Sequence, residues 1–274
     1  MNIKYYWINI DSSIHRKLFM EQQFKLFNID NQRIPAITPE KLPEIMEDKP
    51  PYFCGNIYSC NQSNNCCNFE FACSCSHLNA IKEGYKSGAD YFVVCEDDTY
   101  FTFNLDFDKI IKSLPENWEV FQMMVSDSEV CNKLYNDYYK KNINFIDFDP
   151  NSRLFSANMY LITRKGAEKI LNTCVNNNTD KYDFTNKTTV KQADYLIYMT
   201  AKTYTTTFPL CFPYSKFLSE IHPNHYYFHL EGINKIKEII NDNQLTNSFI
   251  IDYNHIDKFD KIYIKLLQEN GIIK

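Results

Sequence analysis

The sequence predicts an α/β fold with a mainly parallel sheet flanked by helices. Runs rich in aromatic and β-branched residues alternate with helical patterns along the chain, as in parallel strands joined by crossover helices. The first run, KYYWINI at residues 4–10, is apolar enough to be a strand buried on both faces. The length of 274 residues suits one large domain over residues 1–274.

The N-terminal elements follow from local signals. Asp11, Ser12 and Ser13 offer a strand-end loop and a helix cap. The apolar spacing after them predicts a helix that ends at about Phe27. RIPAI at residues 33–37 predicts a short second strand, and its proline favours the edge of the sheet.

Residues 38–72 carry prolines and the segment NIYSCNQSNNCCN, which together predict a long irregular excursion. Excursions of this length in compact domains are commonly functional lids or insertions. Ser76 then predicts the cap of a helix over residues 77–86, which Gly88 ends. A strand at residues 91–95 is expected next.

The alternation of strands and helices continues to the C-terminus, and the tail at about 232–274 is expected to be helical. The patterns predict a helix at 106–114, strands at 118–125 and 144–148, a strand at 157–163 that runs into a helix at 165–174, a polar loop at 176–187, a helix at 190–199, a strand at 204–208, and tail helices at 234–240 and 255–268.

Composition bounds the function and the location. A formal net charge of -5 leaves no broad basic field, so nucleic acid is not expected as the main partner. We find no apolar stretch of the ~20 residues that a membrane span needs, and no secretory leader at the N-terminus. We therefore expect a cytoplasmic protein. The sequence carries no signal for an oligomeric state.

Cysteines gather in an insert at about residues 50–75. Of ten cysteines in the chain, six lie there: Cys54, Cys60, Cys66, Cys67, Cys73 and Cys75. Their spacing contains no CxxC pair, and the nearest histidine is His77, so it is not a typical zinc pattern. Unpaired thiols are the favoured interpretation, with disulfides second and a structural zinc third.

Three consecutive acids follow the strand at residues 91–95, in the segment VVCEDDTY. Ligands of open α/β sheets bind beyond the carboxyl ends of strands. Carboxylates there suit Mg²⁺ or Mn²⁺, which bridge diphosphate oxygens. We expect Asp98 to be a direct metal ligand, Glu96 to bind the ion, its water or a ribose, and Asp97 to orient a sugar. The alternative is a solvated acidic turn.

Four segments resemble glycosyltransferase family 25, the group of lipopolysaccharide-biosynthesis and procollagen galactosyltransferase proteins. They are INIDSSIHRKLFMEQQF, RIPAI, CSCSHLNAIKEGYKSGADYFVVCEDD and SANMYLITRKGAEKIL, in the order typical of the family. Two departures stand out. Ser12 occupies a position where the family usually has an arginine, and the cysteine-rich insert matches no family segment.

The resemblance implies a GT-A (Rossmann-type) fold, a UDP-galactose or UDP-glucose donor, a divalent cation such as Mn²⁺ or Mg²⁺, and inversion at the sugar carbon. It also implies roles for particular positions. Ile8, Asn9 and Asp11 would contact the base and ribose of the nucleotide. Arg16 matches the second arginine of the family, and Ser76 and His77 match its Ser-His pair. The acidic triplet of the family corresponds to Glu96, Asp97 and Asp98.

Ser76 and His77 have a physical rationale of their own if they open a helix. A helix N-terminus presents free N–H groups and partial positive charge to a diphosphate. The alternative is a simple cap followed by a surface histidine. His222 and His225, in HPNH, are candidates to complete the metal shell.

An acceptor hydroxyl must lose its proton to a positioned base. Asp194, in VKQADYLIY, is the first candidate because family members often carry an aspartate in a comparable stretch. Asp127 is the second, because it follows a predicted strand. Each is also consistent with a helix cap or a surface acid.

The sequence does not identify the acceptor, which is a glycan or a protein. Its AT-rich coding bias favours a virus or an intracellular microbe, and hence a place in host cytoplasm or virion. Two other functions remain open. One is a catalytically inactive glycosyltransferase-like scaffold, and the other is a metal-dependent phosphohydrolase that uses the same acids.

Overall fold

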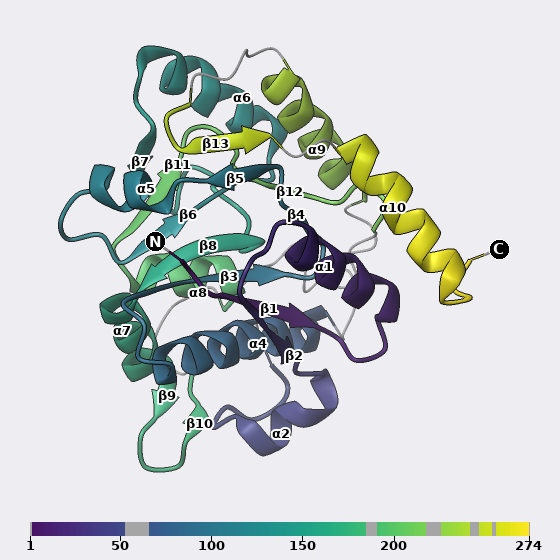
Figure 1. Ribbon diagram of the computed structural model, residues 1–274. Helices are drawn as coiled ribbons and strands as arrows, with labels where there is room; N and C mark the ends of the chain where they lie inside the picture. Colours follow the sequence, from purple (N-terminus) through teal and green to yellow (C-terminus); the bar gives the residue numbers. More distant parts are fainter. Residues whose placement is uncertain are drawn as a thin grey trace.

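The computed structural model describes residues 2–52, 66–184, 191–217, 226–241, 247–253 and 256–273. Its centre is a seven-stranded sheet with helices on both faces (Figure 1). In spatial order the strands are β2 (Asn31–Pro35), β1 (Tyr5–Asn9), β3 (Tyr91–Glu96), β8 (Met159–Thr163), β6 (Val120–Gln122), β11 (Thr203–Thr206) and β7 (Phe145–Asp147).

The α/β class is confirmed, but the sheet is mixed. β8 runs antiparallel to both of its neighbours, β3 and β6, and β7 runs antiparallel to β11, while the other five strands share one direction. A buried apolar strand has the same composition in either direction, so sequence pattern alone did not reveal the reversal. Because β8 is reversed, its first residues lie beside the carboxyl end of β3, where Met159 pairs with Cys95.

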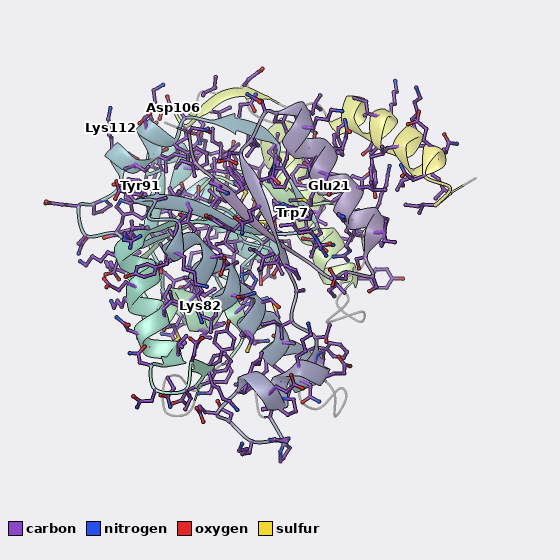
Figure 2. All side chains as sticks on the ribbon, turned by 60° about the horizontal axis from the view of Figure 1, so that its bottom comes forward. Trp7, Glu21, Lys82, Tyr91, Asp106 and Lys112 are labelled. Carbon is purple, nitrogen blue, oxygen red and sulfur yellow. The ribbon has the colours of Figure 1, made fainter. Side chains whose placement is uncertain are left out.

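Side chains alternate between two cores, one on each face of the sheet. On β1, Tyr5 and Trp7 belong to the core beneath α1 (Ile14–Leu26) and the tail, whereas Tyr6 and Ile8 belong to the core beneath α4 (Cys66–Lys86). All five residues of β1 are buried, as the sequence predicts. Figure 2 shows Trp7 among the packed interior side chains and exposed Lys112 at the periphery.

The helices divide between these faces, with α4 and α7 on the side opposite α1 and α10 (Figure 1). α7 (Arg164–Cys174) and α8 (Ala193–Thr200) pack against α4, whereas α6 (Ser128–Asp137) packs against α9 (Tyr226–Asn241) and α1 against α10 (Ile256–Glu269). β2 lies at the edge of the sheet, as its proline predicts.

Smaller elements complete the described chain, and of these only α5 was predicted; α6 was also missed. These elements are η1 (Pro39–Lys41), α2 (Leu42–Ile45), β4 (Thr99–Tyr100) paired with β12 (Phe212–Pro213), β5 (Phe103–Leu105) paired with β13 (Ile250–Tyr253), α5 (Phe107–Ser113), η2 (Tyr139–Lys141), and the hairpin of β9 (Val175–Asn176) and β10 (Lys181–Tyr182).

α4 is longer than predicted, and the expected cap at Ser76 is wrong. The helix already includes Cys66, and Ser76 lies inside it, donating a hydrogen bond of 2.7 Å to the carbonyl of Ala72. Phe71, Cys75 and Leu78 are buried at helical spacing, so the apolar stripe extends upstream of Ser76. The helix ends before Gly88, whose φ of 80° is left-handed, as predicted.

Three described cysteines of the insert lie in α4, and two of them, Cys73 and Cys75, are free thiols. Cys67 and Cys75 are buried, and Cys73 is partly exposed. Cys54 and Cys60 lie outside the described residues, as does the side chain of Cys66. Among the helices of the described ranges, none combines the length and apolar character that a membrane crossing needs.

Candidate functional site

A cleft of about 330 Å³ opens at the carboxyl ends of β1 and β3, against η1 and the middle of α4. This volume lies in the range of small-molecule sites. The cleft brings together most of the site residues that the sequence predicts, namely Ile8, Asn9, Arg16, Ser76, His77, Glu96, Asp97 and Asp98. Cys73, which had no predicted role, lies in the same wall.

Asp97 connects three elements beneath the cleft. Its Oδ1 accepts a hydrogen bond of 2.8 Å from Nη1 of Arg16 on α1, and its Oδ2 accepts one of 2.7 Å from Nδ2 of Asn9 on β1. The Asp97 and Arg16 side chains are both at least nine-tenths buried. This ion pair and its amide partner hold α1 and β1 against the turn that follows β3.

Asp98 carries the most perturbed carboxylate of the acidic triplet. Burial and the neighbouring charge of Glu96 raise its pKa to about 7, against the opposing effect of Arg16. Its Oδ1 accepts a hydrogen bond of 2.6 Å from Nδ2 of Asn158, and the buried Oδ1 of Asn158 has no hydrogen-bond partner among the described residues. The pair therefore places a carboxylic acid and an amide next to each other just beyond the end of β3.

Asn158 was missed by sequence reasoning because its position depends on the direction of β8. It immediately precedes that strand, and the antiparallel pairing brings its carbonyl to the backbone N–H of Glu96 at 2.9 Å. With a parallel β8 it would lie at the opposite end of β3. The direction of the strand was the signal needed to find it.

His77 links α4 to the acids. Its Nε2 lies 3.1 Å from Oε1 of Glu96, and its Nδ1 lies 3.2 Å from the hydroxyl of Tyr160 on β8. Because both His77 and Ser76 lie inside α4, neither stands at a helix N-terminus, and the expected anion site there is wrong. Ser76 instead accepts a hydrogen bond of 2.8 Å from the backbone N–H of Ile37.

Arg33 on β2 organises the rim beside β1. Its Nε donates to Oδ1 of Asn9 at 2.8 Å, and its Nη2 contacts Oδ1 of Asp11 at 2.5 Å. The hydrogen bond and charge of Arg33 hold the pKa of the exposed Asp11 below its usual value. Asp11 is not among the residues that line the cleft.

Asp194 lies in the first turn of α8, close enough to Glu96 for their charges to interact, but it is not among the residues that line the cleft. Burial and the nearby charges of Glu70 and Glu96 raise its pKa to about 6. Its Oδ2 accepts a hydrogen bond of 3.3 Å from the backbone N–H of Ser156, a residue with a φ of 133°. A positive φ at a residue other than glycine stores strain, a frequent feature of functional sites.

Asp127 has a different environment. It is the N-cap of α6, where its Oδ1 accepts hydrogen bonds from the backbone N–H groups of Glu129 and Val130 at 3.0 and 3.1 Å. Its Oδ2 pairs with Arg153 at 2.5 Å, and it is not among the residues that line the cleft. His222 and His225 lie outside the described residues.

Comparison with known proteins assigns the chain to a family. A family model described as glycosyltransferase family 25 (LPS biosynthesis protein) matches residues 2–186, more than half of the 274-residue chain. The match includes β1, α4, β3 and β8, whereas α8 and Asp194 lie beyond its end. A comparison with curated proteins gives no match. The length of the family match establishes that the chain belongs to glycosyltransferase family 25 and is therefore a transferase enzyme.

Proposed function

We propose that the protein is an inverting hexosyltransferase that moves galactose or glucose from a UDP-sugar to a hydroxyl group of a glycan or protein acceptor. The observation that carries the proposal is the convergence of Glu96, Asp97 and Asp98 on the cleft between β1, β3 and α4. We interpret the sheet and this cleft as a GT-A-type nucleotide site, since the cleft lies beyond the carboxyl ends of parallel strands.

The residues of the cleft fit a hard divalent cation. Glu96 and Asp98 line the cleft, and the Asn158 side chain bonds to Asp98, so these residues supply oxygen donors of the kind that Mg²⁺ and Mn²⁺ prefer. Burial and, after it, the charge of Glu96 raise the pKa of Asp98, and a cation would compensate the negative charge of both carboxylates. When bound, such an ion supplies charge neutralisation to the departing diphosphate.

The charge balance of the cleft also favours a cation-dependent enzyme. Among the described residues that line it, Arg16 is the only lysine or arginine, and its guanidinium already pairs with Asp97. The helix N-terminus expected at Ser76 is absent from the wall, because α4 continues upstream. The described lining residues therefore leave little positive charge to balance a diphosphate. We assign the neutralisation of the diphosphate to Mn²⁺ or Mg²⁺ beside Asp98.

Donor binding is proposed for Ile8 and Asn9 at the end of β1, with Ser76 and His77 on the facing helix. Asn9 is fixed by hydrogen bonds to Asp97 and from Arg33, so its backbone is a stable support for a base or ribose. Asp11 is exposed at the rim, and we expect it to contact the nucleotide only at that edge. His222 and His225 remain candidate metal ligands.

Asp194 is the proposed general base. A carboxylate with a pKa of about 6 is mostly ionised at neutral pH and is basic enough to accept a proton in the transition state. The acceptor oxygen forms a bond to the anomeric carbon while the bond from that carbon to UDP breaks on the opposite face. The hydroxyl proton passes to Asp194, and UDP leaves with the bonding electrons.

Release of UDP from a panel of UDP-sugars, with and without a chelator, tests the proposal. We expect turnover with UDP-galactose or UDP-glucose, loss of turnover with chelator, and recovery with Mn²⁺. Release of inorganic phosphate would indicate a phosphohydrolase. UDP binding without turnover across a broad acceptor panel would favour the inactive scaffold. Replacement of both Glu96 and Asp98 by alanine should abolish transfer, whereas Asp106→Asn, at the start of α5, should not.

A further inference from the structure

Cys73, His77 and Glu96 form a cluster of three different metal-ligating groups in the wall of the cleft. One ligand atom from each lies within 4.8 Å of the other two. Cys73 and His77 are four residues apart in α4 and so share one face of that helix, while Glu96 ends β3 opposite them. The chain thus brings a thiol, an imidazole and a carboxylate together from two elements.

The donor set differs from the oxygen donors around Asp98. Thiolate and imidazole are ligands of Zn²⁺ and related ions, whereas Mg²⁺ and Mn²⁺ prefer oxygen. A tetrahedral Zn²⁺ holds its ligand atoms roughly 3.3–3.8 Å apart, as bond lengths of about 2.0–2.3 Å require. The distance of 3.1 Å between His77 Nε2 and Glu96 Oε1 is already close to this spacing. Small side-chain rotations would bring Sγ of Cys73 to the same spacing from these two atoms.

We propose that Cys73, His77 and Glu96 bind a Zn²⁺-class ion at a second metal site of the cleft, separate from the oxygen site at Asp98. The ion would take Sγ of Cys73, Nε2 of His77 and a carboxylate oxygen of Glu96, with a fourth position open to the cleft. All three residues line that cleft, so an ion has a path of entry. Glu96 belongs to both sites, and occupation of one therefore changes the charge of the other.

Tyr160 contacts the side of the His77 ring that faces away from Cys73 and Glu96, and it helps to orient that ring. Its hydroxyl lies 3.2 Å from Nδ1, and the two rings stack with centroids 5.9 Å apart. Metal-binding histidines commonly use their second ring nitrogen in such a hydrogen bond, which fixes the tautomer and the orientation of the ring. With Nδ1–H directed to Tyr160, the lone pair of Nε2 faces Cys73 and Glu96.

The free thiol enters this site protonated. Burial and the neighbouring charges of Glu96, Glu70 and Asp194 raise the pKa of Cys73 well above its usual value. Binding of the ion replaces the thiol proton, so one proton is released to solvent for each thiolate–metal bond formed.

Titration of the reduced, metal-free full-length protein with Co²⁺, in the absence of nucleotide, tests the site. We expect a thiolate-to-cobalt charge-transfer band in the near ultraviolet that Zn²⁺ abolishes. Cys73→Ser should remove the band, and His77→Gln should weaken binding roughly tenfold or more. Cys75→Ser is the matched control and should keep the band, because Cys75 contacts Met46 on another face of the helix.

Absence of the band in the wild-type protein, or its persistence at full strength in Cys73→Ser, would overturn the proposal. A second measurement does not depend on the folding of any variant. Zn²⁺ should slow alkylation of Cys73 in the wild-type protein, as followed by peptide mass spectrometry. Equal labelling of Cys73 with and without Zn²⁺ would also overturn it. Neither readout requires sugar transfer, so the site can fail while the proposed function stands.

Discussion

Nδ2 of Asn158 donates a hydrogen bond of 2.6 Å to Oδ1 of Asp98, across the junction between β3 and the antiparallel strand β8. The amide holds the carboxylate in place and leaves its own buried oxygen without a hydrogen-bond partner among the described residues. Outer partners of this kind orient metal-binding carboxylates and tune their affinity.

Asn158→Ala is therefore expected to weaken Mn²⁺ binding by about 10–100-fold. The variant loses the hydrogen bond that orients Asp98 and the buried amide oxygen next to that carboxylate. Titration of free Mn²⁺ by electron paramagnetic resonance measures the change. Asn151→Ala is the control, because Asn151 is exposed and, within the described part of the chain, bonds to its neighbour Asp149. Equal Mn²⁺ affinity in both variants would contradict the assignment.

Asp194→Asn should reduce the rate of sugar transfer by roughly 10²–10⁴-fold, the usual contribution of a general base. In the wild-type enzyme, kcat/KM should increase with pH as Asp194 ionises near its pKa of about 6. Rate measurements with the UDP-sugar that proves active, taken between pH 5 and pH 8, record this profile. A profile without inflection in that range would speak against Asp194 as the base.

The same variant should make the protein more stable at pH 8. The pKa of Asp194 is higher in the folded chain than its ordinary value of 3.8, so the folded state binds this proton more tightly. Stability from this group is therefore greatest below pH 4 and is lost as pH rises through about 6. At pH 8 the buried charge costs about 3 kcal/mol, which Asn avoids.

Thermal unfolding at pH 8 tests whether Asp194→Asn stabilises the protein, as expected. We expect a higher Tm for Asp194→Asn and a lower Tm for the control Asp127→Ala. Asp127 caps α6 and pairs with Arg153, and loss of such a cap typically costs about 1 kcal/mol. A decrease of Tm in both variants would mean that the Asp194 side chain has a mainly structural role.

Asp97→Ala should destabilise the protein by roughly 3–5 kcal/mol, because it leaves the buried guanidinium of Arg16 without its carboxylate. The matched control is Asp11→Ala, which removes an exposed carboxylate from its pair with Arg33. Urea unfolding should leave that control close to the wild type, since water and salt screen exposed pairs. Similar losses in the two variants would show that burial does not distinguish these pairs.

Local signals predicted much of the site. The density of aromatic and β-branched residues identified β1 as a strand buried on both faces, and the acids after β3 marked the carboxyl end of the sheet. Strand direction is a non-local property, because it depends on which segments pair. The reversal of β8 was therefore not predicted, and Asn158 and Tyr160 were missed with it.

The extent of α4 was missed for a different reason. Asparagines and cysteines upstream of Ser76 resemble a loop, yet Phe71 and Cys75 continue the buried stripe of the helix. With the longer helix, the spacing of Cys73 and His77 would have indicated a shared face. The prediction followed the asparagine- and cysteine-rich composition, although the helical spacing of the apolar residues indicated the correct structure.

Gly232→Ala tests whether the helical tail folds together with the rest of the chain. A Cβ at Gly232 on α9 would lie 2.0 Å from the backbone oxygen of Ser126, which precedes α6. Because the backbone cannot move aside as a flexible side chain does, we expect the free energy of unfolding to fall by about 1–3 kcal/mol.

If the tail and the sheet form one cooperative unit, urea unfolding of Gly232→Ala should remain a single transition at a lower midpoint. Asn234→Ala, at an exposed position of the same helix, should leave the midpoint unchanged. A separate early transition, seen only with Gly232→Ala, would instead mean that α9 and α10 unfold independently of the seven-stranded sheet.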